Sequence, residues 1–178
     1  VAEISSFQLE TVHRFHPVVS AILNITPDHL NRHHTMECYA HTKERIAENQ
    51  TKDDVCVLNM EDEELYRFGS ECKASVVWFS SKRKPDKGAY LDGDDIRYTD
   101  GTQDKLMLNI HDMNLLGTHN YENVCAAIAM TKAVGIPDDI IIEQVKCFKA
   151  VEHRIEYVAT KKGVWYYNDS KGTNPEAS

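Results

Sequence analysis

The sequence contains no run of about 18 apolar residues, the length that a membrane-spanning helix requires. Its first residues also lack the basic and then apolar order of a signal peptide. Positive charge is scarce too, because 20 Lys and Arg face 28 Asp and Glu and leave a net charge of -8. This balance argues against the broad basic face that duplex nucleic acid needs. We expect a cytoplasmic monomer with neither a membrane nor a nucleic acid as its partner.

Cysteine is present but lacks the spacing that would give it a structural role. The five cysteines are odd in number, widely separated, and include no Cys-x-x-Cys pair. Neither a disulfide framework nor a thiolate zinc site is therefore indicated. Reduced thiols in the cytosol fit this pattern best.

What the sequence does contain is the composition of an ordinary globular domain, with 42% hydrophobic and 27% charged residues in a chain of 178. The apolar run 18–25 predicts a buried strand, residues 36–49 a helix, and residues 55–58 a second strand. Strand, helix and strand in this order form a βαβ unit, which is typical of a parallel sheet.

The remaining pattern extends this unit. Turn clusters between residues 88 and 110 predict antiparallel hairpins, which we interpret as a small meander on the main sheet. The fold class is therefore α/β, a mostly parallel sheet flanked by helices. The other predicted elements are a helix at 61–68 ended by Gly69, a strand at 75–79, helices at 120–134 and 138–148, and strands at 155–160 and 164–168.

The opening residues carry the first functional signal. Val1 opens in what reads as a strand, and residues 3–10, Glu-Ile-Ser-Ser-Phe-Gln-Leu-Glu, place an acid, two hydroxyls and an amide at its predicted end. Ligands of open α/β sheets bind at such carboxyl ends. A satisfied sheet edge is the structural alternative for this run.

A second polar cluster, residues 24–33, follows the next predicted strand. Its Asp28 and His29 suit a metal ion or phosphate groups. A histidine-rich stretch from His29 to His41 also allows a zinc site, although no four-ligand spacing is complete. A non-catalytic metal-binding or nucleotide-binding module is accordingly an alternative.

Lys43 is the most informative single residue. Its neighbours on the helix face, three or four positions away, include Tyr39, Ala40, Ile46 and Ala47. That face should be buried, and burial favours a neutral amine that reacts with carbon dioxide or acts as a catalytic group with a shifted pKa. A lysine that reaches past apolar residues to solvent is the structural alternative.

Polar residues also gather in the last third of the chain. Residues 119–123, His-Asn-Tyr-Glu-Asn, open a helix whose free amides favour anions, and Asn side chains can read a base edge or cap the helix. Arg154 precedes a predicted strand, and Asp169 and Lys171 follow another. Together with the earlier runs, these residues place polar clusters at three strand ends.

These runs, in this order, resemble the Mur ligases, the ATP-dependent amide-bond-forming enzymes of cell-wall synthesis. The resemblance covers nearly the whole chain. It rests on the helix with Lys43 and on five runs, SSFQLE, LNITPDHLNRH, GTHNYENVCAA, EHRIE and NDSKGTN. Two positions depart from the family pattern, Asn31 where Asp is frequent and Ala150 where Gly is usual.

The resemblance implies a role for each run. It implies a P-loop-type sheet, ATP as cosubstrate and two Mg²⁺ sites, with catalytic and metal-site roles for Glu3, His29 and Lys43, the lysine as a carbamate. Substrate contacts are implied for Ser5, Gln8, His29 and Thr173. Contacts to ATP are implied for Asn120, Asn123, Arg154, Asp169 and Lys171.

The SSFQLE run resembles the family member that adds D-glutamate to UDP-N-acetylmuramoyl-L-alanine through an acyl phosphate. Residues 1–178 would then be part of the central ATP-binding domain, with the phosphate loop expected before Glu3 and the amino-acid-binding domain after a boundary near residues 170–178. We expect this piece alone to be inactive. Another Mur-type ligase or a folylpolyglutamate synthase is the nearest alternative.

Overall fold

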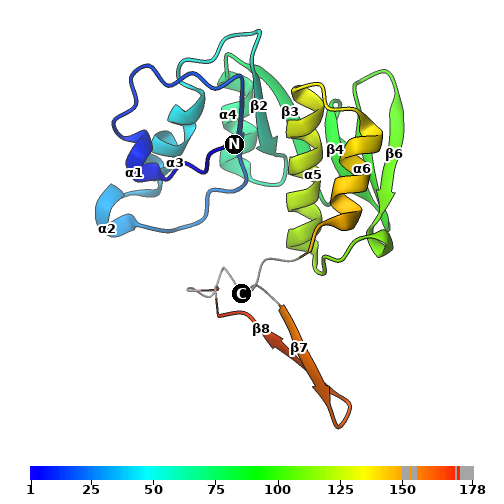
Figure 1. Cartoon of the computed structure of the whole chain (residues 1–178). Helices are drawn as coiled ribbons and strands as arrows, with labels where there is room; N and C mark the ends of the chain where they lie inside the picture. The colour runs from blue at the N-terminus through cyan, green and yellow to red at the C-terminus, as the bar shows by residue number, and fades with distance from the viewer. Residues whose placement is uncertain (150–152, 154–155, 171, 173–178) are drawn as a thin grey trace.

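A computed structural model describes residues 1–149, 153, 156–170 and 172 of the chain. A six-stranded sheet dominates it, with the strands in the order β1-β2-β3-β4-β5-β6 (Figure 1). The first four strands are parallel neighbours, and the last two are antiparallel. The strands are β1 (Val19–Ile22), β2 (Val55–Asn59), β3 (Ser75–Ser80), β4 (Gly88–Asp92), β5 (Asp95–Thr99) and β6 (Asp104–Asn109).

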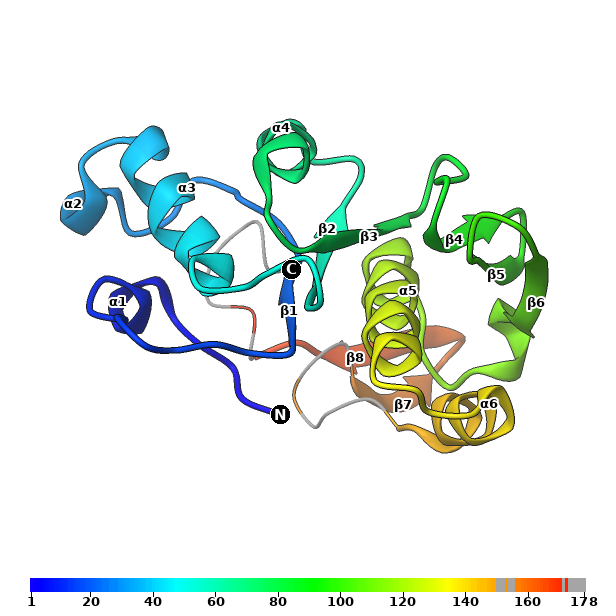
Figure 2. The ribbon, with the colours of Figure 1, turned by 90° about the horizontal axis from the view of Figure 1, so that it is seen from above.

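Helices cover both faces of this sheet (Figure 2). The helices are α1 (Ser6–Leu9), α2 (Leu30–His33), α3 (Met36–Glu44), α4 (Glu63–Glu71), α5 (Thr118–Ala133) and α6 (Asp138–Cys147), with short 3-10 turns at Arg45–Ala47 and Ile110–Asp112. The predicted α/β class, with a mostly parallel sheet and an antiparallel meander, is confirmed.

Two cores lie on the opposite faces of the sheet, because strand side chains alternate between them. In β2, Val57 packs into the core under α5 and α6, whereas Cys56 and Leu58 pack into the core beneath α3 and α4. All three side chains are fully buried. This is the pattern of a strand covered on both faces.

A separate two-stranded sheet, β7 (Glu156–Lys161) and β8 (Val164–Asn168), ends the described chain. Figure 1 shows this hairpin projecting away from the main sheet. None of the helices in the described ranges has the length and apolar character that a membrane crossing requires.

Helix α4 corrects one prediction, because it continues through Gly69 to Glu71 instead of ending there. A β-carbon at Gly69 would lie 2.4 Å from the Trp78 ring of β3. Glycine is therefore present because the helix approaches the sheet closely, and not as a helix terminator.

The helix predicted at 36–49 is also shorter than expected, since regular α-helix ends at Glu44 and a 3-10 turn follows.

Gly88→Ala is expected to lower the free energy of unfolding by about 3 kcal/mol or more. Gly88 has a φ of +145°, and its added β-carbon would lie 1.8 Å from the backbone carbonyl oxygen of Trp78. Gly93→Ala is the matched control, with a φ of +61° and nothing within 4 Å. It should lose only about 1 kcal/mol from the left-handed backbone. Urea denaturation followed by tryptophan fluorescence measures both, and equal losses would contradict the steric argument.

Candidate active site

The opening run forms a capped helix and not a strand end. The Ser5 Oγ accepts a hydrogen bond from the Gln8 backbone N–H, and the Gln8 Oε1 accepts one from the Ser5 N–H at 2.9 Å. Residues 1–5 lie outside any helix or strand. The prediction of a strand here was wrong because Ser-x-x-Gln is a capping box, a signal that the polar composition masked.

His29 opens α2 with an unusual backbone. Its φ is 52°, and His34 at the other end of the helix has a φ of 66°, so residues with positive φ bracket a four-residue helix. The Asp28 carboxylate accepts a hydrogen bond from the His29 N–H at 2.8 Å, and its other oxygen lies 3.5 Å from His29 Nε2. Such backbone is rare for residues other than glycine and clusters at functional sites.

Lys43 brings its amine to the carboxyl end of β1. Its Nζ donates to the Asn24 carbonyl oxygen at 2.9 Å and lies 4.9 Å from the centre of the Tyr39 ring. Burial lowers the pKa of Lys43, while the carboxylates of Asp62 and Asp28 act in the opposite direction. The expected buried helix face is confirmed, since Tyr39, Ala40 and Ala47 are buried and Lys43 is half-buried.

Asp62, which the sequence pattern did not single out, also lies near the carboxyl end of β1. One oxygen of its carboxylate caps α4 by accepting from Glu64 and Leu65 N–H, and the other accepts from Ile25 N–H at 2.7 Å. Asp62 thus ties the segment after β1 to the start of α4. An Asp before two Glu residues is a helix-start signal, but nothing in the sequence connects it to residue 25.

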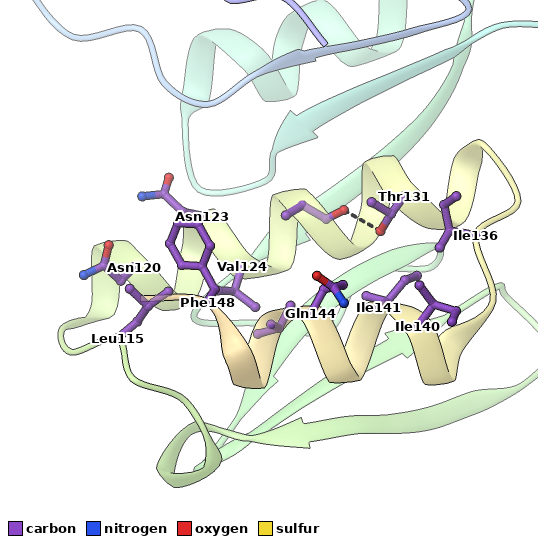
Figure 3. Close-up of a pocket in the computed structure, with 12 residues that line it drawn as sticks. Leu115, Asn120, Asn123, Val124, Thr131, Ile136, Ile140, Ile141, Gln144 and Phe148 are labelled. Carbon is purple, nitrogen blue, oxygen red and sulfur yellow. Dashed lines mark hydrogen bonds between the residues drawn. The ribbon is translucent and has the colours of Figure 1, made fainter. Parts of the chain in front are cut away.

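The two asparagines predicted to contact ATP lie at the start of α5. Asn120 Nδ2 donates to the Leu116 carbonyl oxygen at 2.6 Å, whereas the Asn123 side chain is exposed. Both line a cavity of about 430 Å³ between α5 and α6 (Figure 3). Its other walls are mostly apolar and include Leu115, Ile141 and Phe148.

The structure thus divides the predicted site residues into groups. Those on α1, α2 and α3 lie together, because α3 packs against both short helices. Asn120 and Asn123 form the second group, and Asp169 follows β8, where its carbonyl oxygen accepts from Gly172 N–H. Arg154, Lys171 and Thr173 lie outside the described residues.

No group of three His, Cys, Asp or Glu side chains in residues 1–149, 153, 156–170 and 172 is arranged to hold a metal ion. Two histidines of the stretch considered for zinc have other partners. His33 Nε2 lies 3.0 Å from Ser6 Oγ, and His41 Nδ1 lies 2.8 Å from a Glu44 carboxylate oxygen. All five cysteines are free.

Comparison with known proteins gives matches over the whole chain. The family model described as the Mur ligase middle domain matches residues 1–131. The chain is 83% identical over its full length to the UDP-N-acetylmuramoylalanine--D-glutamate ligase of Lachnospira eligens and 54% identical to the ligase of the same name from Lachnoclostridium phytofermentans. It spans 40% and 39% of the lengths of these relatives.

A solved structure shares the fold at much lower identity. The MurF ligase of Thermotoga maritima in complex with ADP superposes with a TM-score of 0.64 at 21% sequence identity. The match covers 90% of this chain and 37% of that one. The fold of this chain thus also occurs in that solved structure.

Proposed function

The chain belongs to the Mur ligase middle-domain family, and from this premise we propose that residues 1–178 form part of the central ATP-binding domain of a D-glutamate-adding ligase. The enzyme would join D-glutamate to UDP-N-acetylmuramoyl-L-alanine for peptidoglycan synthesis. The observation that carries the proposal is the half-buried Lys43 amine at the carboxyl end of β1, beside two carboxylates. Five free thiols suit the cytoplasm.

The region where α1 and α2 pack against α3, called the α1–α2–α3 corner below, would supply groups for the muramoyl substrate and for Mg²⁺. Ser5, Gln8 and His29 would contact the substrate. Glu3 would hold one Mg²⁺, and His29 and a carbamate on Lys43 would hold the second. The carboxylate and the carbamate would supply the oxygen ligands that Mg²⁺ prefers. Bound Mg²⁺ would offset the negative charge of the phosphate oxygens.

The start of α5 would bind ATP. The cavity bordered by Asn120 and Asn123 has about 430 Å³ and apolar walls, which suits a purine ring with two amides at its edge. Arg154, Asp169 and Lys171 would contact the ribose and the phosphates, and Thr173 the substrate. The N-terminal end of α5 carries the positive end of the helix dipole, which favours nearby negative charge.

The proposed reaction has two steps. The substrate carboxylate attacks the γ-phosphorus of ATP, the bond from that phosphorus to the ADP oxygen breaks, and an acyl phosphate forms. The amine of D-glutamate then attacks the acyl carbon and gives the amide, phosphate and a proton. The chain's part is to hold the two reactants in line.

The test uses an enzyme of the relatives' full length that carries this chain, called the full-length enzyme below. ADP release should require UDP-N-acetylmuramoyl-L-alanine and D-glutamate together. Activity with another amino acid, a different muramoyl acceptor or a folate would instead favour another ligase of the same architecture. Stoichiometric bound zinc without ADP release would favour a non-catalytic metal-binding module.

Asn123→Ala in the full-length enzyme is expected to raise the KM for ATP about tenfold, equal to about 1.4 kcal/mol, because one polar contact to the base is lost. Asn49→Ala is the control. Asn49 donates to the carbonyl oxygens of His13 and Phe15, so its loss should lower stability without changing the KM for ATP. An unchanged KM for ATP in Asn123→Ala would exclude this asparagine from the nucleotide site.

A further inference from the structure

His33 is a polar side chain with an exposed fraction of only 5%. Its Nε2 lies 3.0 Å from the Oγ of Ser6, whose side chain is also buried. His33 is the last residue of α2 and Ser6 the first of α1, so this hydrogen bond joins the two short helices. Neither helix is long enough to be stable without such contacts.

Ring contacts extend from His33 in both directions. The Phe7 ring of α1 stacks on it with centres 5.8 Å apart and an interplanar angle of 10°, and Tyr39 of α3 lies 5.2 Å away. Phe7 in turn contacts His29 at 4.9 Å, and Lys43 Nζ lies 4.9 Å from the Tyr39 ring. These contacts cross all three helices, because they run from His29 through Phe7, His33 and Tyr39 to Lys43.

Ionic contacts hold the far end of α1. The Glu10 carboxylate accepts two hydrogen bonds from Arg32 of α2, at 3.2 and 2.7 Å, and lies 3.7 Å from His33 Nδ1. Arg45 donates to the Glu10 and Val12 carbonyl oxygens. The Arg32–Glu10 ion pair is the more exposed of these contacts, whereas the hydrogen bond between His33 and Ser6 is buried.

We propose that His33 is a positioning residue, which sets the spacing between the muramoyl-binding residues of α1 and the groups His29 and Lys43. This inference rests on the proposed function. His33 acts through Ser6, Phe7 and Tyr39, and does not itself touch substrate. Histidine suits the position because it supplies a flat ring for stacking and a nitrogen for the serine hydroxyl.

The test compares two substitutions in the full-length enzyme. His33→Phe keeps the ring but leaves the buried Ser6 hydroxyl without its partner. It should raise the KM for UDP-N-acetylmuramoyl-L-alanine about tenfold and lower kcat, while the KM for ATP stays unchanged. His33→Gln retains a polar group and should keep the muramoyl KM within about threefold of wild type.

His16→Phe is the matched control. His16 also makes a side-chain hydrogen bond, to Asp54 at 2.7 Å, but it lies outside the α1–α2–α3 corner. It should lower the melting temperature without changing either KM. Ser6→Ala removes the other partner and should raise the muramoyl KM by itself. Combining it with His33→Phe should add little to the single changes, since both remove the same hydrogen bond.

Several results would overturn the positioning role. One is a His33→Phe enzyme with a lower melting temperature but wild-type KM values and kcat, and another is an equal rise in both KM values. If His33→Phe does not fold, Ser6→Ala decides, and an unchanged muramoyl KM there refutes the idea. Failure of the wild-type enzyme to use the muramoyl substrate would instead refute the proposed function.

Discussion

Glu3→Ala in the full-length enzyme is expected to lower kcat on the order of 10³-fold, about 4 kcal/mol in the activation barrier. The Glu3 side chain is exposed and makes no hydrogen bond or ion pair within the part of the chain that the structure describes. It therefore contributes little to folding. Its expected contribution is negative charge for a bound Mg²⁺, which the alanine variant cannot supply.

Two further variants separate charge from position. Glu3→Gln keeps the size of the side chain and removes its charge, so it should be nearly as inactive as Glu3→Ala. Glu143→Ala removes an exposed acid from α6 and should keep wild-type kcat. Circular dichroism and melting temperature should be unchanged in all three. Near-normal turnover of Glu3→Ala would exclude Glu3 as a metal ligand.

The sheet was largely predictable because its signal is carried by short, continuous apolar runs. Residues 56–58 are buried on both faces of the sheet, and in the run 75–79 Val77 and Phe79 are buried while Val76 and Trp78 are partly buried. The meander was predictable for a different reason, since its turns contain glycine and aspartate clusters. These signals are local, and the strands follow them.

Errors arose where one residue type has two physical uses. Gly69 resembled a helix terminator, yet it allows the Trp78 ring to approach α4 closely. The run containing Ser5 and Gln8 resembled the end of a strand, yet these two residues bond to each other as the cap of α1. In each case the role of the residue depends on its partner or on its backbone conformation, and the local sequence pattern shows neither.

The site was predictable in its parts but not in its assembly. Helical spacing was enough to place Lys43 beside Tyr39 on a buried face. It could not show that the amine reaches the Asn24 carbonyl oxygen, or that Asp62 bonds to Ile25 close by, because these contacts join residues 19 and 37 positions apart. Only the fold brings such residues together.

Lys43→Ala in the full-length enzyme is expected to lower kcat about 10³-fold, because we predict that Lys43 acts as a carbamate. Its neutral amine would add to carbon dioxide and release one proton, giving an anion with two oxygens. Burial lowers the pKa of Lys43 and so increases the neutral fraction. An unmodified ammonium would instead repel Mg²⁺.

Lys43→Arg should be as inactive as Lys43→Ala, since arginine keeps a positive charge and cannot form the carbamate. Formate, a small carboxylate, should partly restore Lys43→Ala by filling the vacated space, and should not restore Lys43→Arg. Wild-type activity should fall in buffer freed of carbon dioxide and return with bicarbonate, more completely at higher pH, where more of the amine is neutral.

A direct readout separates the carbamate from other uses of the lysine. Under ¹³C-labelled carbon dioxide, the wild-type enzyme should give a carbamate carbon signal that Lys43→Arg lacks. Lys105→Arg, a change at an exposed lysine paired with Asp138, should retain both the signal and the activity. Normal turnover of Lys43→Arg, or the same spectrum from it as from wild type, would show that Lys43 is not carbamylated. The Asn24 hydrogen bond would then be its structural role, since a half-buried ammonium needs such an acceptor.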